Sequence, residues 1–474
     1  MCEHNEDYND DRFVGKLYYT INNAIREYCS RTDLNVIDPL EIYTVHPVKI
    51  CRINLSPRDQ ASVIGKIPED DRPEAVVAQV IYPFKGKSVE AHNLQEFESF
   101  VVTLCIFCFM IHYMHEKKIY HNDIKPDNIL YMDERLHLVD FGLSGSNNRS
   151  AYDFCVNSIF FFLNIGNFIP FSHISDNQFI NETMYIQFSP EITYFQLMCS
   201  FVSDYLLKKI KEKRRRLKVN TIYKIEDVSS KLLSWDTLYE RFNHFFGEKY
   251  LHIHNTFIDF QRVSIRQLDK DLCDRMFQNV QKLLLDIQFR LSEDNSGVVF
   301  SIIGGLERKD FVSKGYTDFM SFFEKYMPQQ DCWALGATIQ RYLYLVPRSD
   351  AGPADGRRSG RSGRSGRSGR SDRSGPSAPS AESPLSPSDL AIKSAIYDVL
   401  YKNLLVIPVS QRNSAYDFAF QLLRRLNYCG SKIMFDSRLS AILGNATADT
   451  PLKQAQIKYL RKITTTITDS CAIQ

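Results

Sequence analysis

The stretch that decides the fold is residues 120–143, YHNDIKPDNILYMDERLHLVDFGL. It begins with a polar loop and continues with two short runs rich in aliphatic residues, 129–132 and 136–139. Apolar runs of this length on either side of an Asp-Glu pair predict a β-hairpin. An apolar helix over residues 94–118 is expected to lead into the loop, and Asp140 follows the second strand directly.

The polar side chains of this stretch suit phosphoryl transfer. The loop carries Asp123, Lys125 and Asn128, and Asp140 stands at the end of the hairpin. One carboxylate can accept the proton of an attacking hydroxyl group, while the other carboxylate and the amide can hold Mg²⁺ on phosphate oxygens. The ammonium group can neutralise charge on the transferred group. A surface loop that carries this combination by chance is the alternative, and it is not favoured.

These motifs resemble those of the eukaryotic protein kinase family. His-Asn-Asp at 121–123 is similar to the catalytic-loop H-R-D, and Asp-Phe-Gly at 140–142 matches D-F-G at the family spacing. Further along, Ser-Pro-Glu at 189–191 resembles the A-P-E that closes the activation segment. Residues 331–336 resemble the D-x-W-x-x-G that opens the central C-lobe helix, and residues 404–423 resemble the last helices.

The resemblance implies a role for each residue of the site. Asp123 would be the catalytic base, Lys125 would contact the γ-phosphate, and Asn128 and Asp140 would bind Mg²⁺. A lysine two residues after the base resembles serine/threonine kinases rather than tyrosine kinases. The cofactors implied are therefore ATP and Mg²⁺.

The resemblance also implies contacts between distant parts of the chain. Asp331 would brace the catalytic loop, and Arg412 would pair with Glu191. A competing alignment would put the central helix at residues 153–155, but it leaves the Ser-Pro-Glu motif without a role. Asn122 stands where the family has an arginine, so activation by phosphorylation of the activation loop is not expected.

The N-terminal part carries fewer signals. Residues 75–84 form an apolar run that resembles the hinge strand of the family. Lys16, in Phe-Val-Gly-Lys, resembles the ATP-binding lysine of V-A-I-K, with Glu27 on a predicted helix over 21–29 as its ion-pair partner. Lys49 is the other candidate for that lysine. The sequence contains no G-x-G-x-x-G upstream, a motif that normally brings backbone N–H groups over the phosphates.

Composition excludes several protein classes. The chain has 474 residues, of which 44% are hydrophobic and 24% charged, so it is neither disordered nor collagen-like and can bury a large core. A net charge of +2 predicts no membrane and no nucleic-acid partner, except through the basic runs 208–218 and 357–373. The acidic N-terminus resembles no secretory signal, so a soluble, intracellular protein of the cytoplasm or nucleus is expected.

The expected fold class is α+β, with a bilobal protein-kinase-like fold. A reduced β-rich N-lobe would precede a mainly helical C-lobe with a large helical insertion, in which four-three spacing of apolar residues predicts a helix over 273–291. The expected domains are a reduced N-lobe at 1–84, a first C-lobe part with catalytic loop and activation segment at 85–191, a helical insertion at 192–327, a central C-lobe helix at 328–346, a disordered RSG-rich linker at 347–389, and terminal helices with a tail at 390–474.

The residues and the resemblance together predict a serine/threonine kinase that transfers the γ-phosphate of ATP to protein substrates. A pseudokinase or scaffold that acts through its insertion and basic linker is the alternative, supported by the missing glycine motif. A small-molecule kinase of related fold is disfavoured by Lys125 and by the motif at 140–142. The short N-lobe and large insertions are similar to divergent kinases of large DNA viruses such as herpesvirus relatives, for which the compartment would be an infected host cell.

Overall fold

The computed structural model describes much of the N-terminal and C-terminal parts of the chain, only small parts of residues 147–316 and none of residues 346–385. The described residues are 12–53, 56–64, 78–89, 97–146, 189, 222–224, 237, 240, 244, 288–290, 317–345, 386–405, 411–426, 429–444 and 446–472. The predicted contact between Arg412 and Glu191, the two basic runs and nearly all of the RSG-rich linker lie outside these residues.

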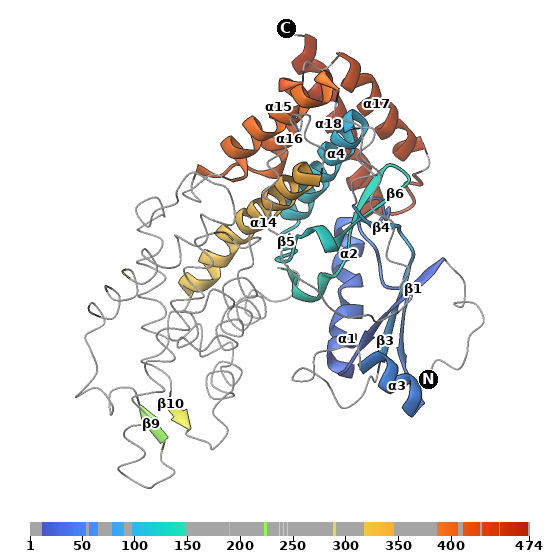
Figure 1. Ribbon diagram of the computed structural model, residues 1–474, viewed down its shortest axis with the longest axis vertical. Coiled ribbons are helices and arrows are strands. Elements are labelled where there is room, and N and C mark those ends of the chain that lie inside the picture. The colour runs from blue at the N-terminus through green and yellow to red at the C-terminus, as the bar shows by residue number, and fades with distance from the viewer. Residues whose placement is uncertain are drawn as a thin grey trace, which may run out of the picture.

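A small antiparallel sheet forms the N-terminal lobe (Figure 1). It contains β1 (Phe13–Tyr18), β3 (Ala78–Pro83) and β2 (Lys49–Arg52) in the order β1-β3-β2. Along β3, buried residues alternate with partly exposed ones, as expected for a sheet that buries one face. The strand expected within residues 75–84 is therefore present, and it is the central strand of the sheet.

Three short helices belong to this lobe. Helix α1 (Ile21–Cys29) has the bounds expected from the sequence and packs against β3. Helix α2 (Arg31–Ile37) follows it after Ser30, and α3 (Pro57–Ile64) follows β2. Because α1 lies on the sheet, its buried residue Glu27 faces the strands rather than solvent.

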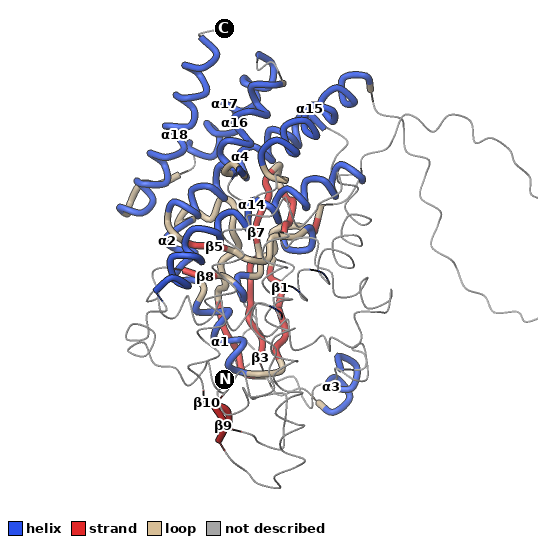
Figure 2. Tube along the Cα trace, turned by 90° about the vertical axis from the view of Figure 1, so that its left-hand side faces the viewer, coloured by secondary structure: helices blue, strands red, loops and turns tan. Residues whose placement is uncertain are grey.

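Helix α4 (Phe97–Glu116) is the centre of the C-terminal lobe. It is apolar on nearly all sides, which is typical of a helix surrounded by other elements. By length and composition α4 could cross a membrane, but 89% of its apolar window is buried inside the protein. The helices packed against it are α15 (Pro387–Asn403), α16 (Ala415–Arg425) and α17 (Cys429–Gly444) (Figures 1 and 2).

The central helix of this lobe is longer than expected. Helix α14 (Thr317–Leu345) begins well before the boundary placed at residue 328 and contains Pro328. Its second half carries the fully buried Trp333. A small β-sheet unit beside a mainly helical unit agrees with the predicted α+β class.

The predicted linker ends earlier than residue 389. Ser386 caps α15 by accepting a hydrogen bond from the Asp389 backbone, and the Asp389 side chain accepts from the backbone N–H of Ser386. This reciprocal cap starts the helix at Pro387. The composition of the segment hid this local helix-start signal.

The described part of the predicted helical insertion contains a pair of strands. Strand β9 (Ile222–Lys224) pairs antiparallel with β10 (Gln288–Arg290). The helix expected over 273–291 was therefore wrong at its C-terminal end. Apolar spacing is a local signal, and it did not reveal the distant partner that turns residues 288–290 into a strand.

The predicted hairpin is present. Strand β6 (Ile129–Met132) pairs with β7 (Arg135–Leu138), and β4 (Lys87–Ser88) pairs with the other edge of β6. Asp133 and Glu134 in the turn have φ of 50° and 56°, as in the two-residue turns that match the twist of a hairpin. The second strand begins and ends one residue earlier than expected.

Two short elements close the loops on either side of the hairpin. The 3₁₀ turn η4 (Pro126–Asn128) precedes β6, and η5 (Phe141–Leu143) follows β7. Strand β5 (Ile119–Tyr120), directly after α4, pairs with β8 (Gly145–Ser146). This pairing holds the start of the polar loop next to the segment that follows Asp140.

A buried carboxylate ties the C-terminal helix α18 (Pro451–Ala472) to the N-terminal lobe. Asp38, which has no exposed surface, accepts hydrogen bonds from the backbone N–H groups of residues 42–44. Gln456 of α18 donates to Asp38 at 2.7 Å and accepts from the backbone of Leu40. Burial raises the pKa of Asp38. The loop after α2 is therefore held both by Asp38, at its start, and by Gln456 of the C-terminal helix α18.

Candidate active site

Lys16 joins the N-terminal sheet to the Asp-Phe-Gly motif. Its Nζ lies 2.8 Å from Oδ1 of Asp140 and 3.8 Å from Oε1 of Glu27. Lys49, the other candidate, lies on the edge strand β2 opposite Ile81. The structure therefore brings Lys16 to Asp140, and it confirms the expected ion pair between Lys16 and Glu27.

Glu27 is held in a crowded, buried position. It is 3% exposed, and the hydroxyl group of Tyr82 donates to its Oε1 at 2.6 Å. Burial raises the pKa of Glu27, and the charge of Lys16 only partly opposes this effect. A Cβ atom at position 142 would come within 2.8 Å of the Glu27 carboxylate, so the glycine of Asp-Phe-Gly allows the close approach.

The Glu27→Gln variant should become more stable relative to the wild type as pH rises from about 4.5 to neutral. Because the folded-state pKa of Glu27 lies above its unfolded value, the folded state binds more protons in this range, and wild-type stability falls as pH rises. Glutamine has no such dependence. Denaturant unfolding at several pH values measures the difference.

The matched control for this experiment is Glu98→Gln, at an exposed position of α4. A stability difference between Glu27→Gln and the wild type that stays constant with pH would contradict the burial argument.

Asp140 is oriented by its backbone and by Lys16. Its φ of 65° lies in the left-handed region, which aspartate enters more readily than most residues. Burial disfavours its charged form, but the charge and hydrogen bond of Lys16 hold the pKa of Asp140 below its ordinary value. The next residue, Phe141, is buried and meets the ring of His121 edge-on, with centroids 4.6 Å apart. Asp140 is therefore a fixed, ionised carboxylate at neutral pH.

Asp123, Lys125 and Asn128 meet in the loop before the hairpin. Oδ2 of Asp123 lies 3.0 Å from Nζ of Lys125 and accepts a hydrogen bond from Nδ2 of Asn128 at 2.9 Å. The same amide nitrogen also donates to the backbone carbonyl of Asp123. The side chain of Asp123 is only 8% exposed, and these contacts with Lys125 and Asn128 fix the position of its carboxylate.

Asp331 of α14 holds the backbone of the loop that carries Asp123. It is fully buried, and its two carboxylate oxygens accept from the backbone N–H groups of His121 and Asn122, each at 2.8 Å. Nε2 of His115 lies 3.1 Å from the same carboxylate. The predicted bracing by Asp331 is therefore present. Residues 153–155, where the competing alignment placed the central helix, lie outside the described residues.

Asn122 stands where the kinase motif has an arginine, and its backbone conformation favours asparagine. Its φ is 64°, in the left-handed region where asparagine is several-fold enriched. The conformation turns its N–H toward Asp331. Asparagine therefore suits the tight loop that the brace requires.

The donor set of the site fits Mg²⁺. Both hydrogen bonds of the Asn128 side chain use its nitrogen, so its carbonyl oxygen is the atom left to bind a cation. Asp140 supplies a carboxylate. Among the described residues no group of three or more His, Cys, Asp or Glu could hold a metal ion. Magnesium is usually bound through one or two carboxylates together with substrate phosphates, so this sparse set is sufficient.

Two contacts of the site were not expected from the sequence. His115, at the end of α4, contacts Asp331, and Tyr82 of β3 holds Glu27. The two-residue period of β3, which places Tyr82 on the same face as Ala78 and Val80, is the signal that could have indicated the second contact. The first depends on α14, which is distant in sequence, and no local pattern indicates it.

Comparisons with known proteins find similarity to protein kinases. Residues 90–161 match the family described as protein kinase domain. A serine/threonine-protein kinase of Acanthamoeba polyphaga mimivirus is 37% identical over 75 residues, which cover 14% of this chain and 27% of the relative. Mitogen-activated protein kinase kinase kinase 8 of Rattus norvegicus is 41% identical over 59 residues, or 12% of each chain.

Another curated relative matches over a shorter segment. Serine/threonine-protein kinase irlE of Dictyostelium discoideum is 47% identical over 47 residues, which are 10% of this chain and 4% of the relative. These matches span about a quarter or less of the curated relatives' length. Among solved structures, the pseudokinase PEAK1 is similar at 11% identity over 66% of this chain and 81% of that chain, with a TM-score of 0.20.

Proposed function

We propose that this chain, whose residues 90–161 match the protein kinase domain family, is an active kinase that transfers the γ-phosphate of ATP to serine or threonine hydroxyl groups of proteins. The observation that carries this proposal is the 2.8 Å contact between Lys16 and Asp140. It joins the sheet to the Asp-Phe-Gly motif, beside a loop in which Asp123 contacts Lys125 and Asn128. A chain released from catalysis has no chemical need for this complete set.

In the proposed reaction each side chain has one task. Asp123 accepts the proton of the substrate hydroxyl as that oxygen attacks the γ-phosphorus, and Lys125, 3.0 Å from Asp123, neutralises charge on the transferred group. Lys16 binds the ATP phosphates and is oriented by Glu27. Asn128 and Asp140 would hold Mg²⁺, which when bound neutralises charge on the phosphate oxygens. The bridging oxygen of ADP leaves with the electron pair of the broken bond.

The Lys16→Met variant is expected to transfer phosphate about 10²- to 10³-fold more slowly than the wild type, because it loses a fixed positive charge at the phosphates. Lys49→Met, on the opposite edge strand of the sheet, is the matched control and should stay close to the wild-type rate. Initial rates on a generic protein substrate with radiolabelled ATP measure both. Phosphoamino-acid analysis of the product identifies the labelled residue type.

The opposite result, loss in Lys49→Met and full activity in Lys16→Met, would contradict the assignment of the ATP-binding lysine. Label on tyrosine or on a small molecule alone would contradict the proposed acceptor.

A pseudokinase or scaffold is the second candidate, because the sequence contains no G-x-G-x-x-G motif. Backbone N–H groups of that motif normally bind the phosphates. This candidate expects no transfer by the wild type, whereas the leading proposal expects transfer that requires Mg²⁺. The same assay therefore separates the two.

A further inference from the structure

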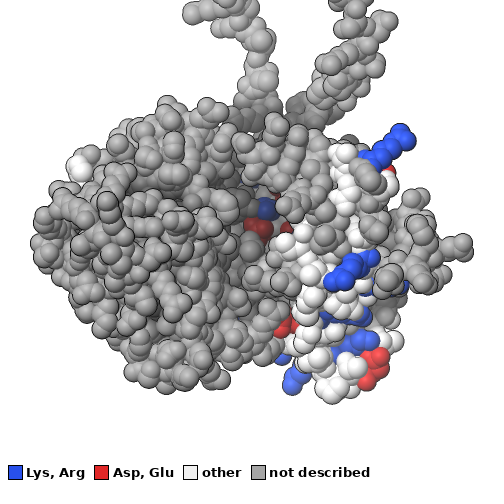
Figure 3. All heavy atoms as spheres, turned by 90° about the horizontal axis from the view of Figure 1, so that it is seen from below, with Lys and Arg blue, Asp and Glu red and all other residues white. Residues whose placement is uncertain are grey.

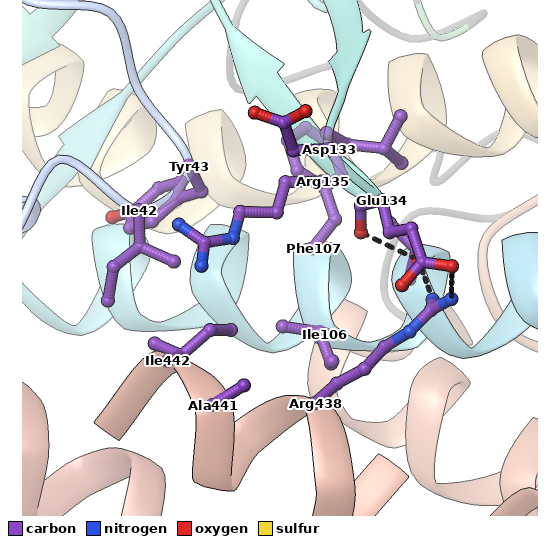
Figure 4. A pocket seen from close by; sticks show the side chains of 12 residues that line it. Ile42, Tyr43, Ile106, Phe107, Asp133, Glu134, Arg135, Arg438, Ala441 and Ile442 are labelled. Carbon is purple, nitrogen blue, oxygen red and sulfur yellow. Dashed lines mark hydrogen bonds and ion pairs between the residues drawn. The ribbon is translucent and has the colours of Figure 1, made fainter. Parts of the chain in front are cut away.

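A pocket lies at the turn of the β6–β7 hairpin, on the side of the C-terminal lobe (Figure 4). Its volume is about 90 Å³. Ile106 and Phe107 of α4 line it together with Leu136 of β7, and Ile42 and Ile442 line it from the loop after α2 and from α17. Three separate parts of the chain therefore build a cavity with both apolar and charged lining residues: the loop after α2, the α4–hairpin unit and α17.

The pocket is separate from the candidate active site. Asn128 and Asp140 stand at the open end of the hairpin, whereas Asp133 and Glu134 line the pocket at its turn. Each strand has four residues, so the two ends are about 13 Å apart at the usual rise per residue. None of the residues that line the pocket belongs to the kinase motifs.

Two arginines reach the pocket, and they differ in charge balance. Arg438 of α17 lies 3.1 Å from the carboxylate of Glu134 and donates to the backbone carbonyl of Ser99 at 2.6 Å. Its charge is therefore compensated. Arg135 has no ion pair or hydrogen bond with its side chain in the described part of the chain. Its guanidinium extends toward Ile42 and Tyr43, at the opposite end of the pocket from Arg438 (Figure 4).

The volume and the lining residues of the pocket indicate which kind of ligand it can bind. A cavity of about 90 Å³ is smaller than the cavities of several hundred Å³ that hold cofactors, so it suits one side chain. Apolar walls favour an aliphatic side chain, and the uncompensated Arg135 favours a carboxylate beside it. The exposed residues Asp133 and Ala441 at the rim leave room for an extended backbone.

We propose that this pocket is a docking site for a short peptide segment of a partner protein, in which an aliphatic residue lies next to an aspartate or glutamate. The aliphatic side chain enters the cavity over Ile106 and Phe107, and the acidic side chain pairs with Arg135. The site would recruit partners independently of the catalytic loop. Peptide binding is measured directly, so the proposal does not depend on phosphoryl transfer.

The test uses the full chain and a set of fluorescent peptides in a Gly-Ser background. Each peptide contains one leucine and one aspartate, either adjacent or separated by one or two residues, and matched peptides carry Leu→Ala or Asp→Asn. At least one spacing should bind in fluorescence polarisation, and each matched replacement should weaken binding about tenfold. The Arg135→Gln variant should lose about tenfold for the aspartate peptide and nothing for the asparagine peptide.

Two further variants separate the pocket from general surface charge. Ala441→Trp places a large ring at the exposed rim and should block binding, whereas Arg424→Gln removes an exposed arginine of α16 and should have no effect. Absence of binding at every spacing, or equal binding to wild type and Arg135→Gln, would overturn the proposal. Binding of dodecanoate without any peptide, lost in Arg135→Gln, would show that the occupant is a fatty carboxylate and would overturn it as well.

On the described part of the face in Figure 3, charged side chains of both signs lie among uncharged ones. The described part of that face therefore suggests no second site of this kind.

Discussion

The Asp123→Asn variant is expected to transfer phosphate about 10²- to 10⁴-fold more slowly than the wild type, the range that general base catalysis contributes. Asparagine keeps the size of the side chain but cannot accept the hydroxyl proton. Asparagine also lacks the negative charge that pairs with Lys125, so the loop loses this ion pair. Initial rates at saturating ATP measure the effect.

Asp127→Asn is the matched control, because Asp127 belongs to the same loop but is exposed. It undergoes the same chemical change and should retain most of the activity. Thermal unfolding of both variants shows whether the fold is kept. Equal rates in Asp123→Asn and the wild type would remove Asp123 from the mechanism.

The Asp331→Ala variant is expected to lose about 2–6 kcal/mol of folding stability. Its carboxylate accepts from two buried backbone N–H groups, those of His121 and Asn122, and each unsatisfied buried group costs about 1–3 kcal/mol. The same change releases the loop that carries Asp123, so activity should fall together with stability. Chemical denaturation gives the free energy of unfolding, and transfer rates below the melting temperature give the activity.

Asp398→Asn is the control for this change, because Asp398 is half exposed and forms only surface ion pairs with Lys402 and Arg425. It should stay within about 0.5 kcal/mol of the wild type. If Asp331→Ala unfolded no more easily than Asp398→Asn, the brace would not hold the loop.

The part of the site that lies close together in sequence could be predicted. The polar loop, the hairpin and Asp140 fall within one short stretch, and helix α1 has the bounds that were expected for the helix carrying Glu27. These features depend on local spacing and turn residues, which one sequence displays directly.

The choice between Lys16 and Lys49 could not be made from the sequence. Both lysines occur in edge strands of the same sheet, and only the folded structure shows which of them reaches Asp140. Strand order depends on pairing between distant segments. The strand pair β9–β10, which contradicted a predicted helix, was hidden for the same reason.

Contacts between residues that lie far apart in the sequence left no signal in local sequence patterns. Gln456 reaches Asp38 across 418 positions, and Asp331 reaches His121 across 210. Resemblance to the kinase family indicated the second contact, while nothing indicated the first. The docking pocket also joins residues that lie far apart in the sequence, since Ile42 and Ile442 both line it.

The most direct test of the account is the rate at which the purified wild-type chain transfers the γ-phosphate of ATP to a protein substrate, with Mg²⁺ and after chelation of Mg²⁺. We expect phosphoserine or phosphothreonine to form only with Mg²⁺, and its formation to be nearly abolished in Asp123→Asn. Absence of transfer by the wild type, or equal labelling by Asp123→Asn, would contradict the account and would favour a scaffold that keeps the architecture of a kinase without its reaction.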